Sequence, residues 1–517
     1  MRSLRQGALS FLAADQRWLL LVGAGLALLV FLSQNRVVGW EPGYNELQPG
    51  HHGWVSSHTL AVIAHATPAN GFVGYALTSL DRDGRMDYEY FDRYPVFFSA
   101  GMHALLSWKS RLSTQIYLAK QAMNGIFLLT LATAYLLLRK LSLSPVRSMT
   151  AAVLAVSSPY LLFYKDMVHY DQPAVLGMLL LVLAIAWTKI DHHRHLVYGA
   201  TLLATGLGRG YASLVILLVW LALEAIEVVR REVPFAPDKV KALLSLTSLR
   251  AAILGTAWAA LNLAYNIHVE ATKRGVALLQ TGIVRSAVDR LALNQDFNAS
   301  YADLLGWRYF VSDEMIRLVR WSFPIWDYEG SWLASTLIVI AMVGGIAVWG
   351  RSMDPARRHV LAILTLSGPI WLIAMRNLSA FHDYTGMYFL GIPLAFFGAS
   401  AHFLRLPRLG WVLALMLSLG VFTARNLQIQ DLHRALGRPY DAYTHDFMRM
   451  ADALPSSGQS IYLADGVPFA PFAFGFYLPD QVLAPQETAA FAIGRDPELR
   501  PMNLTPENSR LFLFENH

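Results

Sequence analysis

The sequence predicts an all-α membrane protein with many spans, and its composition, the length of its apolar blocks and the placement of its charges all indicate this class. Of the 517 residues, 55% are hydrophobic and 15% are charged, whereas a soluble protein carries roughly 25% charged residues. Most apolar residues fall in blocks of about 17–25, the length that crosses a bilayer as a helix. We therefore expect about 11 transmembrane helices, within a range of roughly 10–13.

The apolar blocks follow one another from near the N-terminus to residue 424. They cover residues 18–33, 114–138, 146–164, 172–190, 195–207, 210–229, 249–267, 331–350, 359–375, 385–404 and 409–424. The block 195–207 is short for a complete crossing. The stretch "PVFFSAGMHALLSW", residues 95–108, is also apolar but too short to cross, so we expect a re-entrant or interfacial helix there.

The basic residues predict the orientation of these helices. Lys and Arg gather in every second connection, and these connections are short. They include Arg17, Arg139, Lys140, Lys189, Arg194, Arg230, Arg231, Arg351, Arg357, Arg358, Arg405 and Arg408. Because cytoplasmic loops are enriched in Lys and Arg, we expect a cytoplasmic N-terminus. The long loops 34–113 and 268–330 are then external.

The last part of the chain differs from the rest. Residues 425–517 alternate short apolar runs such as "SIYLAD" and "SRLFLFEN" with Gly and Pro turns, a pattern typical of a small mixed α/β domain. We therefore divide the chain into a transmembrane module, 1–424, and an external C-terminal domain, 425–517.

Composition also excludes several classes of function. The chain has no cysteine, so disulfides, thiolate metal sites and cysteine nucleophiles are excluded. The net charge of +6 is explained by cytoplasmic loops and gives no basic tract typical of nucleic-acid binding. The N-terminal "MRSLRQGALSFLAADQRW" has no clear cleavage site after it, so we expect an uncleaved first helix.

The first external loop contains the first group of candidate site residues. Its segment "PGHHGWVSSHT" holds His51 and His52, and Glu41 and Glu46 precede it. Residues 54–66 have the spacing of a short amphipathic helix, so these histidines can simply face water. A zinc site is the other explanation, although helical zinc ligands normally stand one turn apart and these two are adjacent.

The stretch "YKDMVHYDQPAVLG", residues 164–177, forms the second group. Its ionisable residues are Lys165, Asp166, His169 and Asp171, at the predicted external mouth of two spans. Asp171 is placed to cap the following helix, but capping does not explain the other three. Because ionisable groups at membrane depth are unfavourable, they mark functional sites by default.

Two later turns carry arginines. Arg209 stands between glycines in "GLGRGY", and Arg376 opens "MRNLSAFHDYTGMYF", which also holds His382 and Asp383. An arginine at a span end can bind a phosphate through paired hydrogen bonds, or it can extend to the membrane surface. The two glycines around Arg209 indicate either a close backbone approach to a ligand or a tight turn.

Taken in order, these motifs resemble the GT-C superfamily of integral-membrane glycosyltransferases. The sequence is similar in particular to bacterial enzymes related to the protein O-mannosyltransferases and to the aminoarabinose transferases of lipid A. The stretches that carry the likeness are "YFDRYPVFFSAGMHALLSW", "YKDMVHYDQPAVLG", "GLGRGYASLVILLVWLAL" and "FHDYTGMYFLGIPLAFFGA", and the likeness extends over residues 18–424.

This resemblance implies a sugar, hexose or pentose, that is carried on a polyprenyl phosphate and transferred at the periplasmic face of a bacterial inner membrane. The acceptor would be a glycan, a lipid or a protein. In such enzymes an acidic residue of the first loop acts as general base on the acceptor hydroxyl, and basic side chains hold the departing lipid phosphate. Some members also require a divalent cation, here Mg²⁺ or Mn²⁺.

The resemblance also implies roles for individual residues. Related enzymes carry an aspartate just before the tryptophan of the first loop, whereas this chain has "GHHGW". The base is therefore Glu46, Glu41 or a histidine. By the same resemblance, the second-loop acids Asp166 and Asp171 orient the acceptor or a metal. The basic residues that contact phosphate are Arg209, Arg376 and Lys165. The polar residues that line the substrate are His51, His52, His382 and Asp383.

Two other classes compete with this interpretation. A flippase or transporter of lipid-linked glycans would be expected to show repeated halves, and the sequence has none that we detect. A polymerase or ligase of lipid-linked glycans would show an arginine-rich late external loop, and residues 268–330 do contain several arginines. The large first loop favours the glycosyltransferase.

Overall fold

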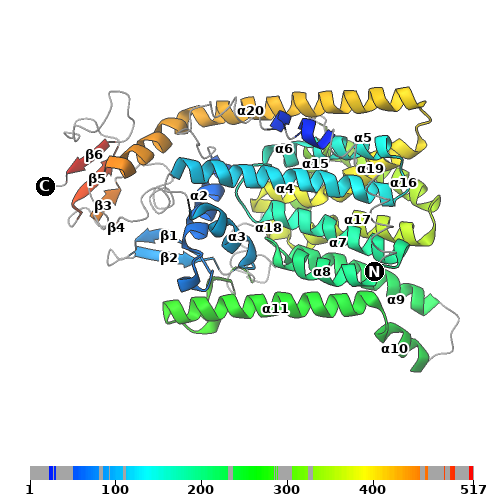
Figure 1. Cartoon of the computed structure of the whole chain (residues 1–517), viewed down its shortest axis with the longest axis horizontal. Coiled ribbons are helices and arrows are strands. Elements are labelled where there is room, and N and C mark those ends of the chain that lie inside the picture. The colour runs from blue at the N-terminus through cyan, green and yellow to red at the C-terminus, as the bar shows by residue number, and fades with distance from the viewer. Residues whose placement is uncertain are drawn as a thin grey trace.

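The protein is a bundle of long helices with two small β-sheets at one end (Figure 1). The computed structural model describes residues 22–26, 28–30, 50–80, 86–91, 93–108, 112–230, 237–283, 286, 288, 306–323, 330–453, 460–463, 482–483, 489–494 and 512–515. We call the end with the sheets, on the left of Figure 1, the sheet end, and the opposite end the loop end.

Helices occupy all the predicted spans. They are α4 (Leu112–Lys140), α5 (Pro145–Val156), α6 (Pro159–Phe163), α7 (Asp171–Asp191), α8 (Arg194–Gly206), α9 (Tyr211–Arg230), α11 (Thr247–Arg274), α16 (Trp332–Arg351), α17 (Pro355–Ala374), α19 (Gly391–Phe403) and α20 (Arg408–Ala453), and residues 22–26 and 28–30 of the first block are helical too. Among the described residues, six helices are long and apolar enough to cross a membrane. The predicted class, a helical membrane protein with many spans, is confirmed, whereas the count of about 11 stays a prediction.

One predicted span, 146–164, is broken in the structure. Helix α5 ends at Val156 and α6 begins at Pro159. The Ser158 hydroxyl accepts a hydrogen bond from the backbone N–H of Leu161 at 3.3 Å, and Pro159 takes the first helical position, where its missing N–H is not needed. The serine and proline therefore restart the helix close to the site.

Helix α7 lies at the centre of the bundle and packs against α4, α8, α9 and α17. Gly177 permits its close approach to α8, because a Cβ there would lie 3.2 Å from the Cα of Ala204. At the loop end, Lys140 Nζ of α4 lies 2.5 Å from Asp191 Oδ2 of α7. This ion pair joins the ends of two helices that run in the same direction.

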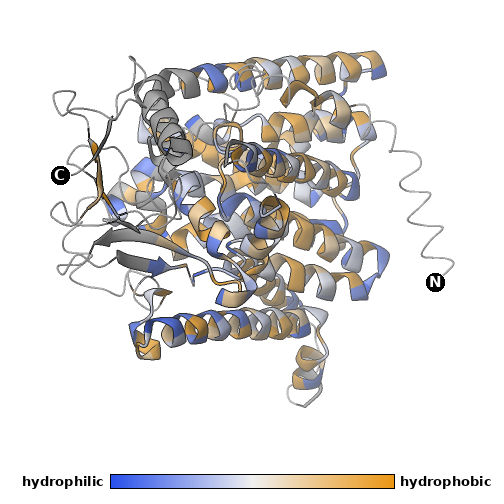
Figure 2. Ribbon diagram, turned by 60° about the vertical axis from the view of Figure 1, so that its left-hand side comes forward, coloured by the Kyte–Doolittle hydropathy of each residue, from blue (hydrophilic) through white to orange (hydrophobic). Residues whose placement is uncertain are grey.

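The outer helices present apolar side chains to their surroundings. Along α20, Leu409, Leu413 and Leu417 form a stripe at four-residue spacing and are 70%, 57% and 70% exposed. Figure 2 shows hydrophobic residues along the helices of the bundle. Such a stripe is unfavourable in water and is expected where a helix faces lipid.

The loop 34–113, which we predict to be external, has its described residues at the sheet end. Helix α2 (Gly50–His65) includes the predicted helix 54–66, η1 (Pro68–Asn70) follows, and β1 (Tyr75–Leu80) pairs antiparallel with β2 (Met86–Tyr90). The apolar stretch 95–108 forms the ten-residue helix α3 (Phe97–Leu106), which is too short to cross a bilayer.

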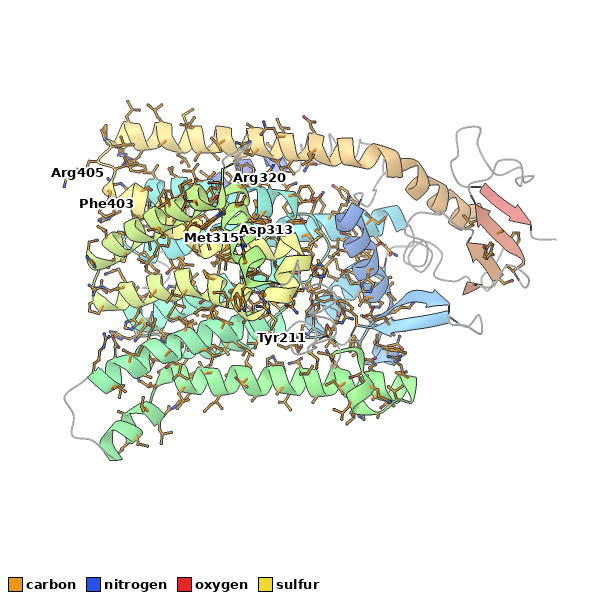
Figure 3. The ribbon with its side chains drawn as sticks, turned by 180° about the vertical axis from the view of Figure 1, so that it is seen from behind. Tyr211, Asp313, Met315, Arg320, Phe403 and Arg405 are labelled. Atoms are coloured by element: carbon orange, nitrogen blue, oxygen red, sulfur yellow. The ribbon has the colours of Figure 1, made fainter. Side chains whose placement is uncertain are left out.

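The predicted external loop 268–330 contains helices that we did not expect. The short η2 (Leu278–Gln280) follows α11, and α15 (Trp307–Ser322) packs against α16 and against η3 (Asp383–Leu390). Figure 3 labels Asp313, Met315 and Arg320 on α15, within the bundle. Helix α15 therefore supports the turn at residues 383–390. The connection after α9 carries the short helix α10 (Pro237–Leu244), and α18 (Arg376–Phe381) precedes η3.

Helix α20 joins the bundle to the C-terminal sheet. It has 46 residues and is therefore about 69 Å long, more than twice the thickness of a bilayer core. It passes through residue 425, where we expected a domain boundary, without a break. The sheet beyond it has the order β4 (Val482–Leu483), β3 (Ser460–Leu463), β5 (Phe491–Gly494) and β6 (Phe512–Glu515). Only the β5–β6 pair is antiparallel.

Candidate active site

A buried network around Asp171 lies at the sheet end, where α7 begins. The Asp171 carboxylate is fully buried, and its Oδ2 accepts a hydrogen bond from His169 Nδ1 at 2.5 Å. Its Oδ1 accepts one from the Tyr388 hydroxyl at 2.8 Å and lies 3.1 Å from Arg209 Nη1. The network thus joins the α6–α7 connection, the α8–α9 connection and η3 around one carboxylate.

The two glycines beside Arg209 allow its turn to pack against the start of α7. Gly208 has a φ of +53°, and a Cβ there would lie 2.1 Å from the carbonyl oxygen of Tyr170. A Cβ on Gly210 would lie 2.1 Å from the carbonyl oxygen of Thr205. The backbone N–H of Arg209 donates to the same Tyr170 carbonyl at 3.1 Å. Of the two explanations for these glycines, the structure therefore shows the tight turn.

Aromatic rings enclose the Arg209 guanidinium. Its Cζ lies 5.1 Å from the ring centre of Tyr94 and 5.8 Å from that of Tyr384, which are cation–π distances. Tyr94 also packs on Tyr170, with ring centres 4.7 Å apart. The cation is thus held by a carboxylate on one side and by aromatic rings on others, away from water.

A cavity of about 200 Å³ opens beside this network. Its polar lining includes Arg93, Tyr94, Arg209 and Tyr211, and Figure 3 labels Tyr211 at the start of α9. The rest of the wall is largely apolar and includes Leu263 of α11, Ile283, Trp371 of α17, Met375 and Leu378. The surface of the cavity is therefore almost entirely apolar, with Arg93 and Arg209 among the residues that line it.

The segment that carries Arg93 and Tyr94 is held in place by α11. The side-chain amide of Asn266 donates to the backbone carbonyl of Tyr94 at 2.7 Å, and Asn266 is fully buried. Arg93 forms an ion pair with Glu89 of β2. The motif "YFDRYP" thus places an arginine and a tyrosine on the cavity wall.

Lys165 and Asp166, two of the predicted site residues, are buried just before α7. Lys165 is 0% exposed and Asp166 is 2% exposed. Burial, together with the nearby charge of Lys120, lowers the pKa of Lys165, while the charge of Asp166 opposes this shift. The structure thus brings Lys165, Asp166 and Asp171 to the same end of α7.

Arg376 and His382 lie farther along the chain, near the cavity wall formed by Met375 and Leu378. Arg376 begins α18, and its Cζ lies 4.3 Å from the ring centre of Trp307 on α15. The ring of His382 stacks on Tyr384 at 5.1 Å, and Tyr384 in turn packs on Arg209. His382 is therefore connected to the Asp171 network through one ring.

Several predicted residues have side chains outside the described part of the chain. Glu41 and Glu46 precede residue 50 and lie outside it entirely. The backbone of His51 and His52 forms the first turn of α2, and that of Asp383 opens η3, but their side chains are not described. The roles of these five residues stay predictions.

The ring of His58 in α2 is buried against the same cluster. It is 6% exposed and meets Phe91 edge to face at 5.0 Å. Burial, followed by the charges of Arg93 and His169, lowers the pKa of His58 to about 3. His58 is therefore neutral in the folded protein at ordinary pH.

Sequence reasoning did not single out several residues of this network. These are Arg93, Tyr94, Tyr384 and Tyr388, and His169 was noticed without a role. All five stand inside the quoted motifs "YFDRYP", "YKDMVHYD" and "HDYTGMYF". Tyrosine near a membrane surface is common at any span end, so its presence alone gave no signal.

Asp171 and the other acids that the structure describes at this site do not form a metal centre. Among the described residues, no group of three or more His, Asp and Glu side chains could hold a metal ion. Both carboxylate oxygens of Asp171 already face protein donors. The use of Mg²⁺ or Mn²⁺ stays a prediction, because Glu41, Glu46 and the side chain of Asp383 lie outside the described part of the chain.

The fold defines a class: the chain has the polytopic helical fold of the GT-C glycosyltransferases, the fold that the resemblance in the sequence predicts. One particular similar structure is that of ArnT from Cupriavidus metallidurans bound to undecaprenyl phosphate. Its TM-score is 0.57 at 11% identity, and the match covers 96% of this chain and 98% of that chain.

A second similar structure is the apo oligosaccharyltransferase of Archaeoglobus fulgidus. Its TM-score is 0.52 at 11% identity over 92% of this chain, and this chain spans 65% of the length of that protein. No protein family and no curated protein sequence matches the chain. The likeness therefore resides in the fold rather than in the sequence.

Proposed function

We propose that the protein is a glycosyltransferase that moves a sugar from a polyprenyl-phosphate donor to an acceptor at the sheet end. The observation that carries this proposal is the largely apolar cavity beside Arg209, with Arg93 and Arg209 among its lining residues. A polyprenyl phosphate has the same two parts, a charged phosphate and a hydrocarbon chain. The similar ArnT structure contains bound undecaprenyl phosphate, which supports this choice of donor.

The reaction requires one bond to form and one to break. An acceptor oxygen attacks the anomeric carbon, and the bond from that carbon to the phosphate oxygen breaks. The phosphate leaves with the electron pair, so negative charge develops there. Arg93 and Arg209 are placed to stabilise this charge in a cavity poor in water, and the acceptor proton passes to a base.

Asp171 has a positioning role in this proposal. Its two oxygens already face His169, Tyr388 and Arg209, so it holds the arginine rather than taking a proton from substrate. The base is then a carboxylate of the first loop, Glu46 or Glu41, as the sequence resemblance implies. His169 is a further candidate, because a proton on Nδ1 leaves its Nε2 as the accepting nitrogen.

The proposed orientation puts the sheet end in the periplasm of a bacterial cell and the loop end in the cytoplasm. Basic residues gather in the connections at the loop end, including Arg139, Lys140, Arg351, Arg357 and Arg405. This distribution supports a cytoplasmic loop end. Figure 3 labels Arg405 there, opposite the sheets.

Sugar transfer in lipid nanodiscs tests the proposal. The purified protein receives a panel of hexosyl and pentosyl polyprenyl phosphates with candidate glycan, lipid and peptide acceptors, and released polyprenyl phosphate and glycosylated product are measured. We expect Arg93→Gln and Arg209→Gln each to reduce release at least roughly 100-fold, as removal of a group that stabilises the transition state does. Arg405→Gln, at the loop end, is the matched control and keeps full activity.

Two results would overturn the proposal. Movement of the lipid-linked sugar across the bilayer without release of polyprenyl phosphate would indicate a flippase. Undiminished release in both arginine variants would mean that the cavity is not the donor site. Glu46→Gln, Glu41→Gln and His169→Asn then identify the base, because only its loss removes the acidic limb of the pH–rate profile, where protonation of the base slows the reaction.

A further inference from the structure

Lys165 is a buried cation whose charge the network around Asp171 does not use. It is 0% exposed, and its Nζ has no hydrogen-bond partner among the residues that the structure describes. An ammonium group has three donors, and its burial without partners is strongly unfavourable. We expect such a group either to lower the stability of the fold without serving a function or to bind an anion.

A second lysine lies close to it. Lys120 of α4 is 4% exposed, and its charge is near enough to lower the pKa of Lys165. The acid among the charges that act on Lys165 is Asp166. Charges of both signs therefore act on Lys165, and neither of them donates to or accepts from its Nζ in a hydrogen bond.

The relative register of α4 and α7 shows at which level of the bundle Lys120 lies. The Lys140–Asp191 ion pair aligns the two helices at the loop end. Lys120 and Asp171 each stand twenty residues before these partners, and both helices rise about 1.5 Å per residue. Lys120 is therefore level with the start of α7.

Gln172 follows Asp171 in the first turn of α7. It is 2% exposed, and neither its amide nitrogen nor its amide oxygen has a hydrogen-bond partner among the described residues. One residue along a helix turns the side chain by about 100°, so Gln172 leaves α7 in a different direction from Asp171. It adds an unused N–H donor at the level of the lysines.

We propose that Lys165, Lys120 and Gln172 form a second anion site that binds a phosphate group of the acceptor, separated from the donor cavity by the connection His169–Asp171. Lysines bind phosphate as point charges, and the amide offers a further donor. The assignment to the acceptor rests on the proposed glycosyltransferase function. Donor and acceptor phosphates would then lie on either side of the start of α7.

Thermal unfolding of the full chain in phosphatidylcholine nanodiscs tests the site, with inorganic phosphate as the first probe. The Arg93→Gln background weakens phosphate binding in the donor cavity, so the remaining response reports the second site. Lys165→Met keeps the length of the side chain and removes the charge. We expect it to raise Tm without phosphate by roughly 1–3 °C and to abolish the rise that phosphate produces in the same background.

The matched control is Lys189→Met. Lys189 is a largely buried lysine of α7, the helix that follows Lys165, but its Nζ lies 2.5 Å from Glu224 Oε1. Its removal leaves that glutamate unpaired and is expected to lower Tm.

A second arm of the experiment replaces some phosphatidylcholine with phosphatidic acid. A response to phosphatidic acid alone assigns the site to a lipid phosphate, and a response to both probes assigns it to phosphate in general.

The proposal is overturned if Lys165→Met lowers Tm without phosphate, if it retains the full phosphate response, or if neither probe stabilises the protein. These outcomes are independent of sugar transfer. If no donor of the panel is consumed and Lys165→Met still abolishes the phosphate response, the anion site stands and the proposed glycosyltransferase function fails. If sugar transfer occurs and Lys165→Met keeps the phosphate response, the glycosyltransferase function stands and the anion site fails.

Discussion

At the scale of single residues, the site depends on one buried carboxylate. Asp171 balances the charge of Arg209 and accepts hydrogen bonds from His169 and Tyr388. The two interactions differ in kind, because the arginine contact is an ion pair and the tyrosine contact is a single hydrogen bond to a charged acceptor. Removal of the Asp171 charge should therefore cost more stability than removal of the Tyr388 hydroxyl.

We expect Asp171→Asn to destabilise the protein by about 3–5 kcal/mol, because it leaves a buried guanidinium without its counter-charge. Tyr388→Phe removes one hydrogen bond to a charged group and should cost about 1.5–3 kcal/mol. Thermal unfolding in nanodiscs measures both, with Tyr198→Phe on α8 as a control of little effect. Equal losses in the Asp171 and Tyr388 variants would show that Arg209 does not depend on the carboxylate.

At the scale of elements, α11 braces two walls of the cavity. Asn266 holds the carbonyl of Tyr94 at 2.7 Å. One turn later, the buried Glu270 carboxylate accepts the backbone N–H of Gly282, with both oxygens at 3.2 Å. Gly282 precedes Ile283, which lines the cavity. The helix therefore positions segments from both of the loops that we predict to be external.

Asn266→Leu tests this brace. Loss of the bond frees the backbone at Tyr94, so we expect the affinity for polyprenyl phosphate to fall roughly tenfold, the equivalent of about 1.4 kcal/mol. Binding of undecaprenyl phosphate measures it. Asn262→Leu is the matched control, because Asn262 lies one turn earlier and its side-chain amide donates to the carbonyl of Trp258 in its own helix. A similar loss in both variants would assign the effect to α11 in general.

The helix α2 gives the fold a pH dependence through His58. The pKa of His58 is about 3 in the folded protein and about 6.5 in the unfolded chain. Below pH 6.5 the unfolded state takes up a proton that the folded state does not. Stability is therefore complete above pH 6.5 and falls by about 1.4 kcal/mol per pH unit toward pH 3.

His58→Phe should remove this loss. Between pH 7 and pH 5 we expect the wild type to lose about 2 kcal/mol more stability than the variant, as measured by denaturant titration in detergent at both pH values. His195→Asn, which changes an exposed histidine at the loop end, should leave the wild-type slope unchanged. An identical slope in His58→Phe would show that His58 is protonated in the fold.

Elements were more predictable than contacts between them. The apolar block 172–190 corresponds to α7, Asp171–Asp191, because the bilayer fixes both the length and the composition of a span. Helix α15 was missed because its charged and apolar residues are mixed, as in "SDEMIRLVR". The bond from Tyr388 to Asp171 joins residues 217 positions apart, and no local pattern specifies such a pair.

At the scale of the whole molecule, the two ends of the bundle differ in charge and in the elements that lie on them. The loop end carries short basic connections, whereas the sheet end carries the β1–β2 hairpin, α3 and the C-terminal sheet (Figure 1). A chain that follows the positive-inside rule is inserted with its basic connections in the cytoplasm. The donor cavity, which lies at the sheet end, would then open to the periplasm.

The absence of cysteine, 0 of 517 residues, makes this orientation directly measurable, because one introduced cysteine is the only thiol. Ala69→Cys lies in η1 at the sheet end, and Ser352→Cys follows α16 at the loop end; both positions are exposed. We expect a membrane-impermeant maleimide to label the Ala69 variant in spheroplasts and the Ser352 variant only after permeabilisation. The wild type, with no thiol, sets the background. The opposite pattern would place the arginine cavity on the cytoplasmic side, where the donor sugar would have to be presented before it crosses the membrane, and would replace the periplasmic transferase with a cytoplasmic one.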